Sequence, residues 1–198
     1  MEKLLYQLRN WRAHWRAFWL GSYIVLEGIA ARAFSFAVTG TPGNVMGRIA
    51  AEGRLDAVLI RNGERIDLGC LGRRVVTTAG VNYIRDDFAN SAGGADVSLF
   101  KYHDSGIGTT AEAIGDTALV TPTGDARVAG TQDNSVAKTY KSVATISYAA
   151  NKAVTEHGLF TAAAAGTLLD RTVFAAINVV GGSDSIQFTY TLTINDGG

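Results

Sequence analysis

The segment DSIQFTYTLTIN, residues 184–195, places apolar and polar residues in strict alternation. Successive side chains of a β-strand point to opposite faces, so this pattern predicts a strand that is buried on one face only. The residues expected to face a core are Ile186, Phe188, Tyr190, Leu192 and Ile194. Such a strand needs a sheet around it and a second layer that covers its apolar face.

A tight hairpin is indicated earlier in the chain. Residues 55–68, LDAVLIRNGERIDL, contain two extended runs on either side of Asn62-Gly63. This dipeptide is a strong signal for a type I′ turn, because both turn residues adopt positive φ. Further strands are expected over residues 96–106, 135–150 and 168–180.

One short helix interrupts the strands. Val81, Ile84 and Phe88 share a face at helical spacing, and Thr78 is of a type that caps helix N-termini. The glycine- and threonine-rich residues 106–119 predict an ordered loop with one helical turn. Several strands, one helix and no βαβ alternation indicate a mainly β fold, an antiparallel β-sandwich with one short helix.

The N-terminal region follows a different pattern. Apolar residues recur at spacings of four, three, four and three, which draws one stripe along an amphipathic helix, with arginines on the neighbouring face. The stripe consists of Leu4, Leu8, Trp11, Trp15 and Phe18. So much apolar surface needs a partner: the protein's own core or a sister subunit, a different protein, or a lipid surface. Aromatic residues and arginines are the usual interface anchors. The predicted contact residues are Leu8, Trp11, Arg12, Trp15, Arg16, Phe18 and Trp19.

This region is predicted to be neither a signal peptide nor a membrane span. Arg9, Arg12 and Arg16 run through its aromatic part, where a signal peptide has an uninterrupted apolar stretch. Its most apolar part, residues 17–31, includes Glu27 and is shorter than the roughly 20 apolar residues of a spanning helix. We therefore expect a helical arm over residues 1–38, a glycine-rich linker over 39–54 and the β-sandwich over 55–198.

The composition narrows the class of function. Basic and acidic residues each number 18 in 198, so the formal net charge is zero and nucleic acid is not expected as a specific partner. The single cysteine, Cys70, excludes an intrachain disulfide, and its place between Leu68 and Leu71 predicts a small core residue. No cysteine–histidine cluster has zinc spacing, and we expect neither a metal nor a cofactor.

Residues 154–174, VTEHGLFTAAAAGTLLDRTVF, contain the best candidates for chemistry. Glu156 and His157 are neighbours on an expected strand, so they point to opposite faces and cannot readily act on one substrate atom. The sequence favours hydrogen-bonded polar positions at a strand end, on the rim of the sandwich. Asp170 and Arg171 are interpreted as a local ion pair or as a contact with a neighbouring subunit.

The other polar clusters are weaker candidates. His103-Asp104 has the same strand geometry, and Asp86-Asp87 is expected to face solvent on a helix. Ser142 does not lie in a GxSxG context, and the stretch GIGTT lacks the lysine of a phosphate loop. The sequence therefore predicts no active site, and we expect a protein without catalysis.

Five motifs occur in a fixed order in the second part of the chain. They are VVTTAGVNYIRDDF, GIGTTAEAIGDTAL, TEHGLF, GTLLDRTVF and DSIQFTYTLTI. In this order they resemble a family of small structural proteins encoded by tailed bacteriophages. The resemblance covers about residues 73–196 and does not extend to residues 1–50.

The resemblance implies a non-enzymatic virion component that is assembled in the host cytoplasm in several copies. The first expectation is a capsid decoration (cement) protein, which binds the major capsid protein, its own copies or both, and stabilises the head. The alternative is a tail, baseplate or fibre-associated module that contacts other tail proteins, or a host-surface glycan through Tyr83, Phe100 and Tyr102. Membrane association through the Trp/Arg helix is a third, less favoured expectation.

Overall fold

The structure, a computed structural model, describes residues 49–74, 76–89 and 94–196. The predicted arm and most of the predicted linker lie outside the described residues. The same holds for the contact residues predicted on the arm, which are Leu8, Trp11, Arg12, Trp15, Arg16, Phe18 and Trp19.

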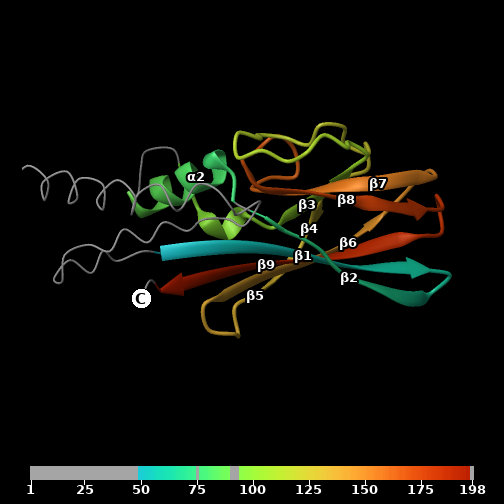
Figure 1. Cartoon of the computed structure of the whole chain (residues 1–198), viewed down its shortest axis with the longest axis horizontal. Coiled ribbons are helices and arrows are strands. Elements are labelled where there is room, and N and C mark those ends of the chain that lie inside the picture. The colour runs from blue at the N-terminus through green and yellow to red at the C-terminus, as the bar shows by residue number, and fades with distance from the viewer. Residues whose placement is uncertain (1–48, 75, 90–93, 197–198) are drawn as a thin grey trace, which may run out of the picture. The chain divides into compact units, whose positions relative to one another are not determined.

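The described residues form two antiparallel sheets and one α-helix, which confirms the predicted mainly β fold (Figure 1). The strands are β1 (Ile49–Arg61), β2 (Glu64–Arg74), β3 (Tyr102–Gly106), β4 (Val128–Ala129), β5 (Thr131–Asp133), β6 (Thr139–Ser147), β7 (Lys152–Phe160), β8 (Leu168–Val179) and β9 (Ser185–Asp196). The helix is α2 (Thr78–Phe88), and a 3₁₀ turn, η1, spans Val97–Leu99. One sheet has the strand order β2-β1-β9-β6-β5, and the other has the order β4-β3-β7-β8.

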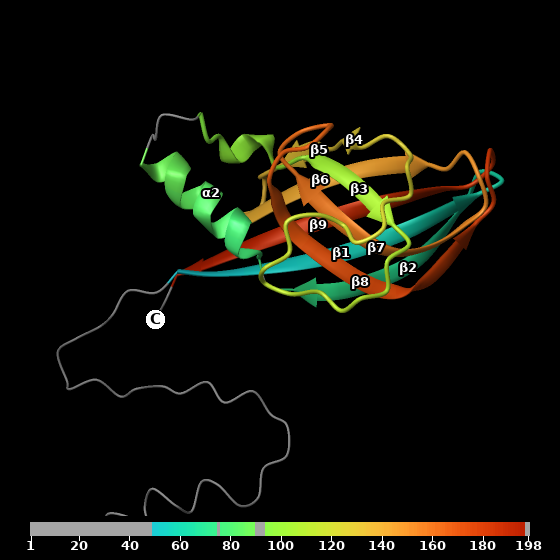
Figure 2. The same ribbon diagram turned by 90° about the horizontal axis from the view of Figure 1, so that it is seen from above.

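The main core lies between the two sheets. Leu55 and Phe188 of the five-stranded sheet belong to the same buried cluster as Val154 and Val179 of the four-stranded sheet. Full burial of an apolar side chain of this size contributes about 1.5–3 kcal/mol, so this interface carries much of the stability. The helix α2 lies at the end of the sheets where β1 begins and β9 ends (Figure 2).

The alternation predicted for β9 is confirmed over most of the strand. Ile186, Phe188, Tyr190 and Leu192 are buried, as expected, whereas Ile194 is 45% exposed. Ile194 lies at the end of β9, beyond the buried cluster that covers Leu192. The alternation therefore predicted which face of the sheet each side chain is on, but it did not predict whether other residues bury that side chain.

The Asn62-Gly63 turn is also confirmed, since both residues have positive φ and connect β1 to β2. The predicted linker boundary is wrong at its C-terminal side, because residues 49–54 already belong to β1. They pair with the C-terminal half of β9, and Gly53 lies opposite Leu192. Long-range pairing thus holds a glycine-containing segment in a strand that local sequence does not favour.

The predicted N-cap of α2 is one residue off, and the apolar face predicted there is covered only in part. Thr77, not Thr78, is the N-cap, and its side chain accepts a hydrogen bond from Gly80 N. Val81 and Phe88 are 53% and 84% exposed, whereas Ile84 packs against the cluster that includes Leu169. The helix sits so closely on β8 that a Cβ at Gly80 would lie 2.9–3.0 Å from atoms of Leu169. The close contact at Gly80 therefore determines which face of α2 packs against β8.

The core position predicted for Cys70 is wrong, because Cys70 is exposed. Two register shifts in the β1–β2 pairing, between Leu55 and Asp56 and between Ala57 and Val58, interrupt the strict alternation of β2. Leu68 and Leu71 consequently both pack against the core, and Cys70, one of the two residues between them, is exposed. β-Bulges of this kind re-aim side chains and cannot be read from an apolar run.

Two predictions between α2 and β6 were partly wrong. Only the second half of the strand expected over residues 96–106 is extended, because Asp96 caps the turn η1 through Ser98 N. Residues 107–119 form the expected loop, but no part of this stretch is helical.

Replacing Gly63 by alanine should destabilise the protein, because φ at Gly63 is +82°. Left-handed backbone costs a residue with a Cβ about 1–2 kcal/mol. Urea unfolding should show a loss of this size for Gly63→Ala. Gly115→Ala is the matched control, since a Cβ there meets nothing within 4 Å and φ is not positive. Equal losses in the two variants would contradict the assignment of a strained turn.

Candidate functional site

The middle of β7 carries two fully buried polar residues, Glu156 and His157. They belong to opposite faces of the strand, as the sequence predicts: Glu156 contacts the loop of residues 107–121, and His157 contacts Phe188 in the core. Their predicted position on the rim is wrong. Asp170 and Arg171 on β8 are also buried, so all four charged or polar groups of this segment lie inside the protein. A covering loop, which strand alternation does not reveal, accounts for the difference.

On the outer face of the four-stranded sheet, the Glu156 carboxylate holds this loop. It accepts hydrogen bonds from the backbone N–H groups of Gly108 at 3.0 Å, Val120 at 3.1 Å and Thr121 at 2.8 Å. The Thr155 hydroxyl adds a hydrogen bond to Gly108 O at 2.8 Å. One carboxylate therefore organises both ends of the loop.

Arg171 completes this network from β8. Its Nε donates to Glu156 Oε2 at 2.7 Å, and its Nη1 donates to Asp116 Oδ2 at 3.0 Å. Its Nη2 donates to Thr110 O at 2.9 Å. The predicted local pair of Asp170 and Arg171 is therefore wrong. Neighbours on a strand face opposite ways, and Asp170 instead accepts a hydrogen bond from the Thr172 hydroxyl.

The environment of Glu156 favours its charged form. Burial alone raises the pKa of this carboxyl, but hydrogen bonds from Thr121 N, Arg171 and Val120 N outweigh that effect and hold the pKa below its ordinary value. Glu156 is therefore ionised at neutral pH and neutralised by a fixed partner. A general acid or base needs to exchange a proton with a substrate, whereas this group is enclosed and its acceptor positions are occupied.

A second network crosses the interior between the sheets. His103 Nδ1 lies 2.9 Å from His157 Nε2, and His103 Nε2 lies 2.8 Å from Ser142 Oγ. All three residues are fully buried, on β3, β7 and β6. Burial lowers the pKa of His103 to about 3. Burial, and next the neighbouring His103, lower the pKa of His157 well below its ordinary value. Both rings are neutral at physiological pH.

A serine, a histidine and a second histidine in hydrogen-bonded order have the arrangement of a nucleophile, a base and an orienting group. Here the arrangement is sealed. The chain crosses from β4 to β5 at Gly130, and a Cβ there would collide with Ser142 Oγ and lie 2.9 Å from His103 Nε2. No space is left beside Ser142 for a substrate, so the network ties strands together.

This second network was not predicted from the sequence. His103 lies 39 positions from Ser142 and 54 from His157, and the three residues belong to three different strands. The available signal was that each occupies an inward position of its strand. Bringing them together requires the strand order, which a single sequence does not provide.

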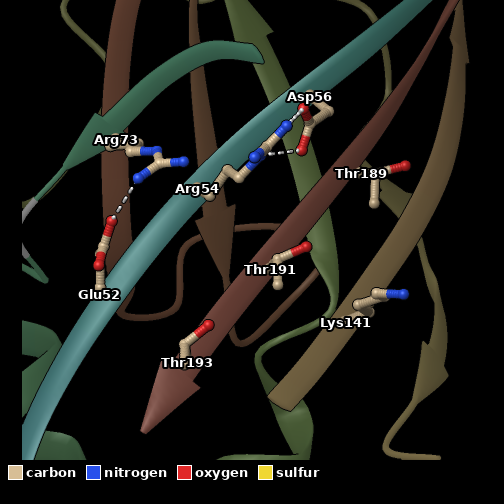
Figure 3. A pocket seen from close by; sticks show the side chains of 8 residues that line it. All are labelled: Glu52, Arg54, Asp56, Arg73, Lys141, Thr189, Thr191 and Thr193. Atoms are coloured by element: carbon tan, nitrogen blue, oxygen red, sulfur yellow. Dashed lines mark hydrogen bonds and ion pairs between the residues drawn. The ribbon is translucent and has the colours of Figure 1, made fainter. Parts of the chain in front are cut away.

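The outer face of the five-stranded sheet carries a shallow hollow of about 550 Å³ (Figure 3). It is lined by Glu52, Arg54, Asp56, Arg73, Lys141, Thr189, Thr191 and Thr193. Arg54 is held by Asp56 through two hydrogen bonds of 2.6 and 2.7 Å, and Arg73 lies 3.5 Å from Glu52. Because neighbouring carboxylates neutralise the arginines, the hollow is a weak candidate for a polyanion.

A second hollow, of about 470 Å³, is mainly apolar, and we call it the α2 groove. It lies between α2, η1, β6 and the end of β9. Its lining residues are Ile84, Asp87, Phe88, Val97, Ser98, Phe100, Gln132, Asp133, Asn134, Tyr140, Leu169, Leu192 and Ile194. Phe88 is 84% exposed there, and Ile194 and Val97 are also exposed. The exposed apolar side chains around an apolar floor make this groove a candidate binding surface.

The aromatic residues considered for glycan binding are not displayed on loops. Phe100 is buried, and Tyr83 packs edge-on against it with 5.0 Å between the ring centroids. Tyr102 is partly buried against the cluster of Leu119, Phe160 and Leu168. Stacking on a sugar requires an exposed ring face, which Phe100 does not offer, and Tyr83 and Tyr102 are themselves half-buried.

Comparison with known proteins assigns no family: no family model, curated protein or solved structure matches the chain significantly. None of the helices within the described residues is long and apolar enough to cross a membrane. Within residues 49–74, 76–89 and 94–196, no three His, Cys, Asp or Glu side chains are grouped to hold a metal ion. Function is therefore inferred from this chain's own geometry and from its motifs.

The two buried histidines predict a loss of stability in mild acid. Their pKa values are lower in the folded state than the ordinary value of 6.5, so the unfolded chain binds more protons below that pH. Stability should be complete above about pH 6.5 and fall below it by up to about 1.4 kcal/mol per pH unit for each histidine. Glu156 acts only at lower pH, as pH falls below its ordinary pKa of 4.5. Urea unfolding between pH 7.5 and 5 measures the slope.

His157→Phe is the matching variant, because it removes one titrating ring and keeps an aromatic group beside Phe188. It should reduce that slope by about half. A slope that does not depend on either histidine would show that these rings are not buried in neutral form.

Removal of the Arg171 guanidinium should leave Glu156 as a buried charge without its partner. Breaking a buried pair from one side costs about 3–5 kcal/mol, so Arg171→Met should be strongly destabilised. In hydrogen exchange, the amides of Gly108, Val120 and Thr121 should lose protection. Arg85→Met is the control, since Arg85 pairs with Asp86 on an exposed surface and should behave like the parent protein. Unchanged protection of the loop amides in Arg171→Met would contradict the anchoring role.

Proposed function

We propose that this chain is a non-enzymatic structural protein of a tailed-phage virion, a capsid decoration protein that binds the major capsid protein and stabilises the head. The observation that carries the non-enzymatic part is the enclosure of the acid–base groups. Glu156, His157, His103 and Ser142 are all fully buried and hydrogen-bonded to one another or to the backbone. The virion assignment rests on the resemblance over residues 73–196.

The surface supports a role in assembly. Ile107, Ile114 and Val120 are exposed on the loop that Glu156 and Arg171 hold in place. A loop fixed before binding loses little conformational entropy when it meets a partner. Apolar residues on a rigid backbone thus favour contact with another protein surface.

Charge supports the same class of partner. The chain has no net charge, and the hollow on the outer sheet face balances its arginines with carboxylates. Binding to nucleic acid would draw on clustered, unneutralised cations. A decoration protein instead holds capsid subunits through many modest contacts, whose effects multiply when a protein engages several sites at once.

The test is the position of the protein in purified particles of the phage that encodes it. Cryo-electron microscopy of virions carrying a labelled copy should show the label repeated over the icosahedral shell. Label confined to the tail would replace decoration by a tail or baseplate role. Absence from purified particles would overturn the virion assignment.

The predicted arm has its own test in the same particles. Trp11→Ala combined with Trp15→Ala should leave the fold of residues 49–196 intact and abolish incorporation, since aromatic anchors dominate interfaces. Circular dichroism checks the fold, and quantification of the protein in purified virions checks incorporation. Normal incorporation of the double variant would show that the arm is not needed for binding.

A further inference from the structure

The α2 groove exposes apolar side chains that a monomer normally covers. Phe88 at the end of α2 is 84% exposed, and Ile194 near the end of β9 is 45% exposed. The floor consists of Phe100, Leu169 and Leu192, which belong to one buried cluster. A hollow of about 470 Å³ lies within the range of about 300–1,000 Å³ that pockets offer to small ligands, so it takes a few side chains and not a whole helix.

The N-terminal residues that precede β1 are connected to the sheets at this same end. Ile49, the first residue of β1, pairs with Asp196, and Ala51 pairs with the groove residue Ile194. Forty-eight residues precede Ile49. Every copy of the protein therefore brings one groove and one such N-terminal segment to an assembly.

The sequence of that segment matches the chemistry of the groove. Its apolar stripe, Leu4 to Phe18, would extend about 21 Å as a helix and present single large side chains at each turn. Arg9, Arg12 and Arg16 flank the stripe. Asp87 and Asp133 line the groove together with its apolar floor, so its charge and apolar character are complementary to those of the segment.

We propose that the α2 groove binds the apolar, arginine-flanked face of residues 4–19 from a second copy of this chain. The zero net charge supports such self-association, since it gives the copies no overall repulsion. The contact joins two different surfaces, so it is heterologous and links copies head to tail into rings or open chains. This self-association concerns the purified protein and does not depend on the virion role.

Disulfide crosslinking between two differently tagged full-length proteins tests the proposal directly. Both carry Cys70→Ser, which removes the exposed native thiol. One carries Trp15→Cys and the other Phe88→Cys. Mild oxidation of the mixture should give a covalent heterodimer of the two tags. The control replaces Phe88→Cys by Ile114→Cys, a position that is 63% exposed and lies outside the groove.

Sedimentation velocity of the full chain provides a second measurement. Phe88→Ser with Ile194→Ser should weaken self-association about tenfold or more, because two apolar contacts are lost. Val81→Ser with Ile114→Ser is the matched control, since it also alters exposed apolar residues, one of them on α2, and should associate like the parent.

Several outcomes would overturn the proposal. These are a full chain that stays monomeric at high concentration, equal crosslinking of Phe88→Cys and Ile114→Cys, and equal weakening by the groove and control pairs. Absence of a covalent heterodimer of the two tags would also overturn binding between copies. None of these results bears on where the protein sits in a particle, so the two proposals fail separately.

Discussion

The ion pair of Glu156 and Arg171 is the constraint on which one face of this protein depends. Withdrawing two charges from water costs several kcal/mol each, and their attraction offsets that cost only when the remaining polar atoms are also satisfied. Here the loop supplies those partners, through three backbone N–H groups to Glu156 and through Thr110 O and Asp116 to Arg171. Without the loop, the pair would be incompletely hydrogen-bonded, and without the pair, the loop would have no anchor on the sheet. Sheet and loop therefore stabilise each other.

The hydrogen bonds of His157, His103 and Ser142 join the two sheets to each other, as the ion pair joins sheet and loop. Ser142 belongs to the five-stranded sheet, and His103 and His157 belong to the four-stranded sheet, so the hydrogen bonds join two layers that otherwise meet through apolar contacts. Apolar packing tolerates small sliding, whereas a hydrogen bond of 2.8–2.9 Å does not. We infer that these hydrogen bonds fix the alignment of the two sheets near Gly130, where the polypeptide also crosses from one sheet to the other.

The sequence predicted the features that depend on local periodicity. It did not predict those that depend on which strands pair or on which residues are buried by other segments. The alternation of β9 and the positive φ of Asn62-Gly63 follow from backbone geometry, and both were right. Cys70 was misplaced because bulges in β2 interrupt the alternation. Glu156 was assigned to the right face of β7 but to the wrong environment. Alternation along a strand predicts the side to which a residue points, but it does not reveal that a loop covers that residue. The hydrogen-bonded set of His103, Ser142 and His157 required the order of strands in space.

In this protein the buried polar groups and the candidate binding surfaces lie in different places. In an enzyme, buried polar groups converge on a cavity, where their unsatisfied valences act on a substrate. Here Glu156 pairs with Arg171 and the loop, and His103 is hydrogen-bonded to His157 and Ser142. The braced loop and the α2 groove, in contrast, expose several apolar side chains. Polar interiors of this kind make the outer surface rigid, and rigidity lets small apolar contacts hold a partner without a large ordering cost. Such contacts are individually weak, so they become effective when many copies bind at once. The interior chemistry and the surface composition are thus both consistent with the role proposed above, repeated attachment to other proteins.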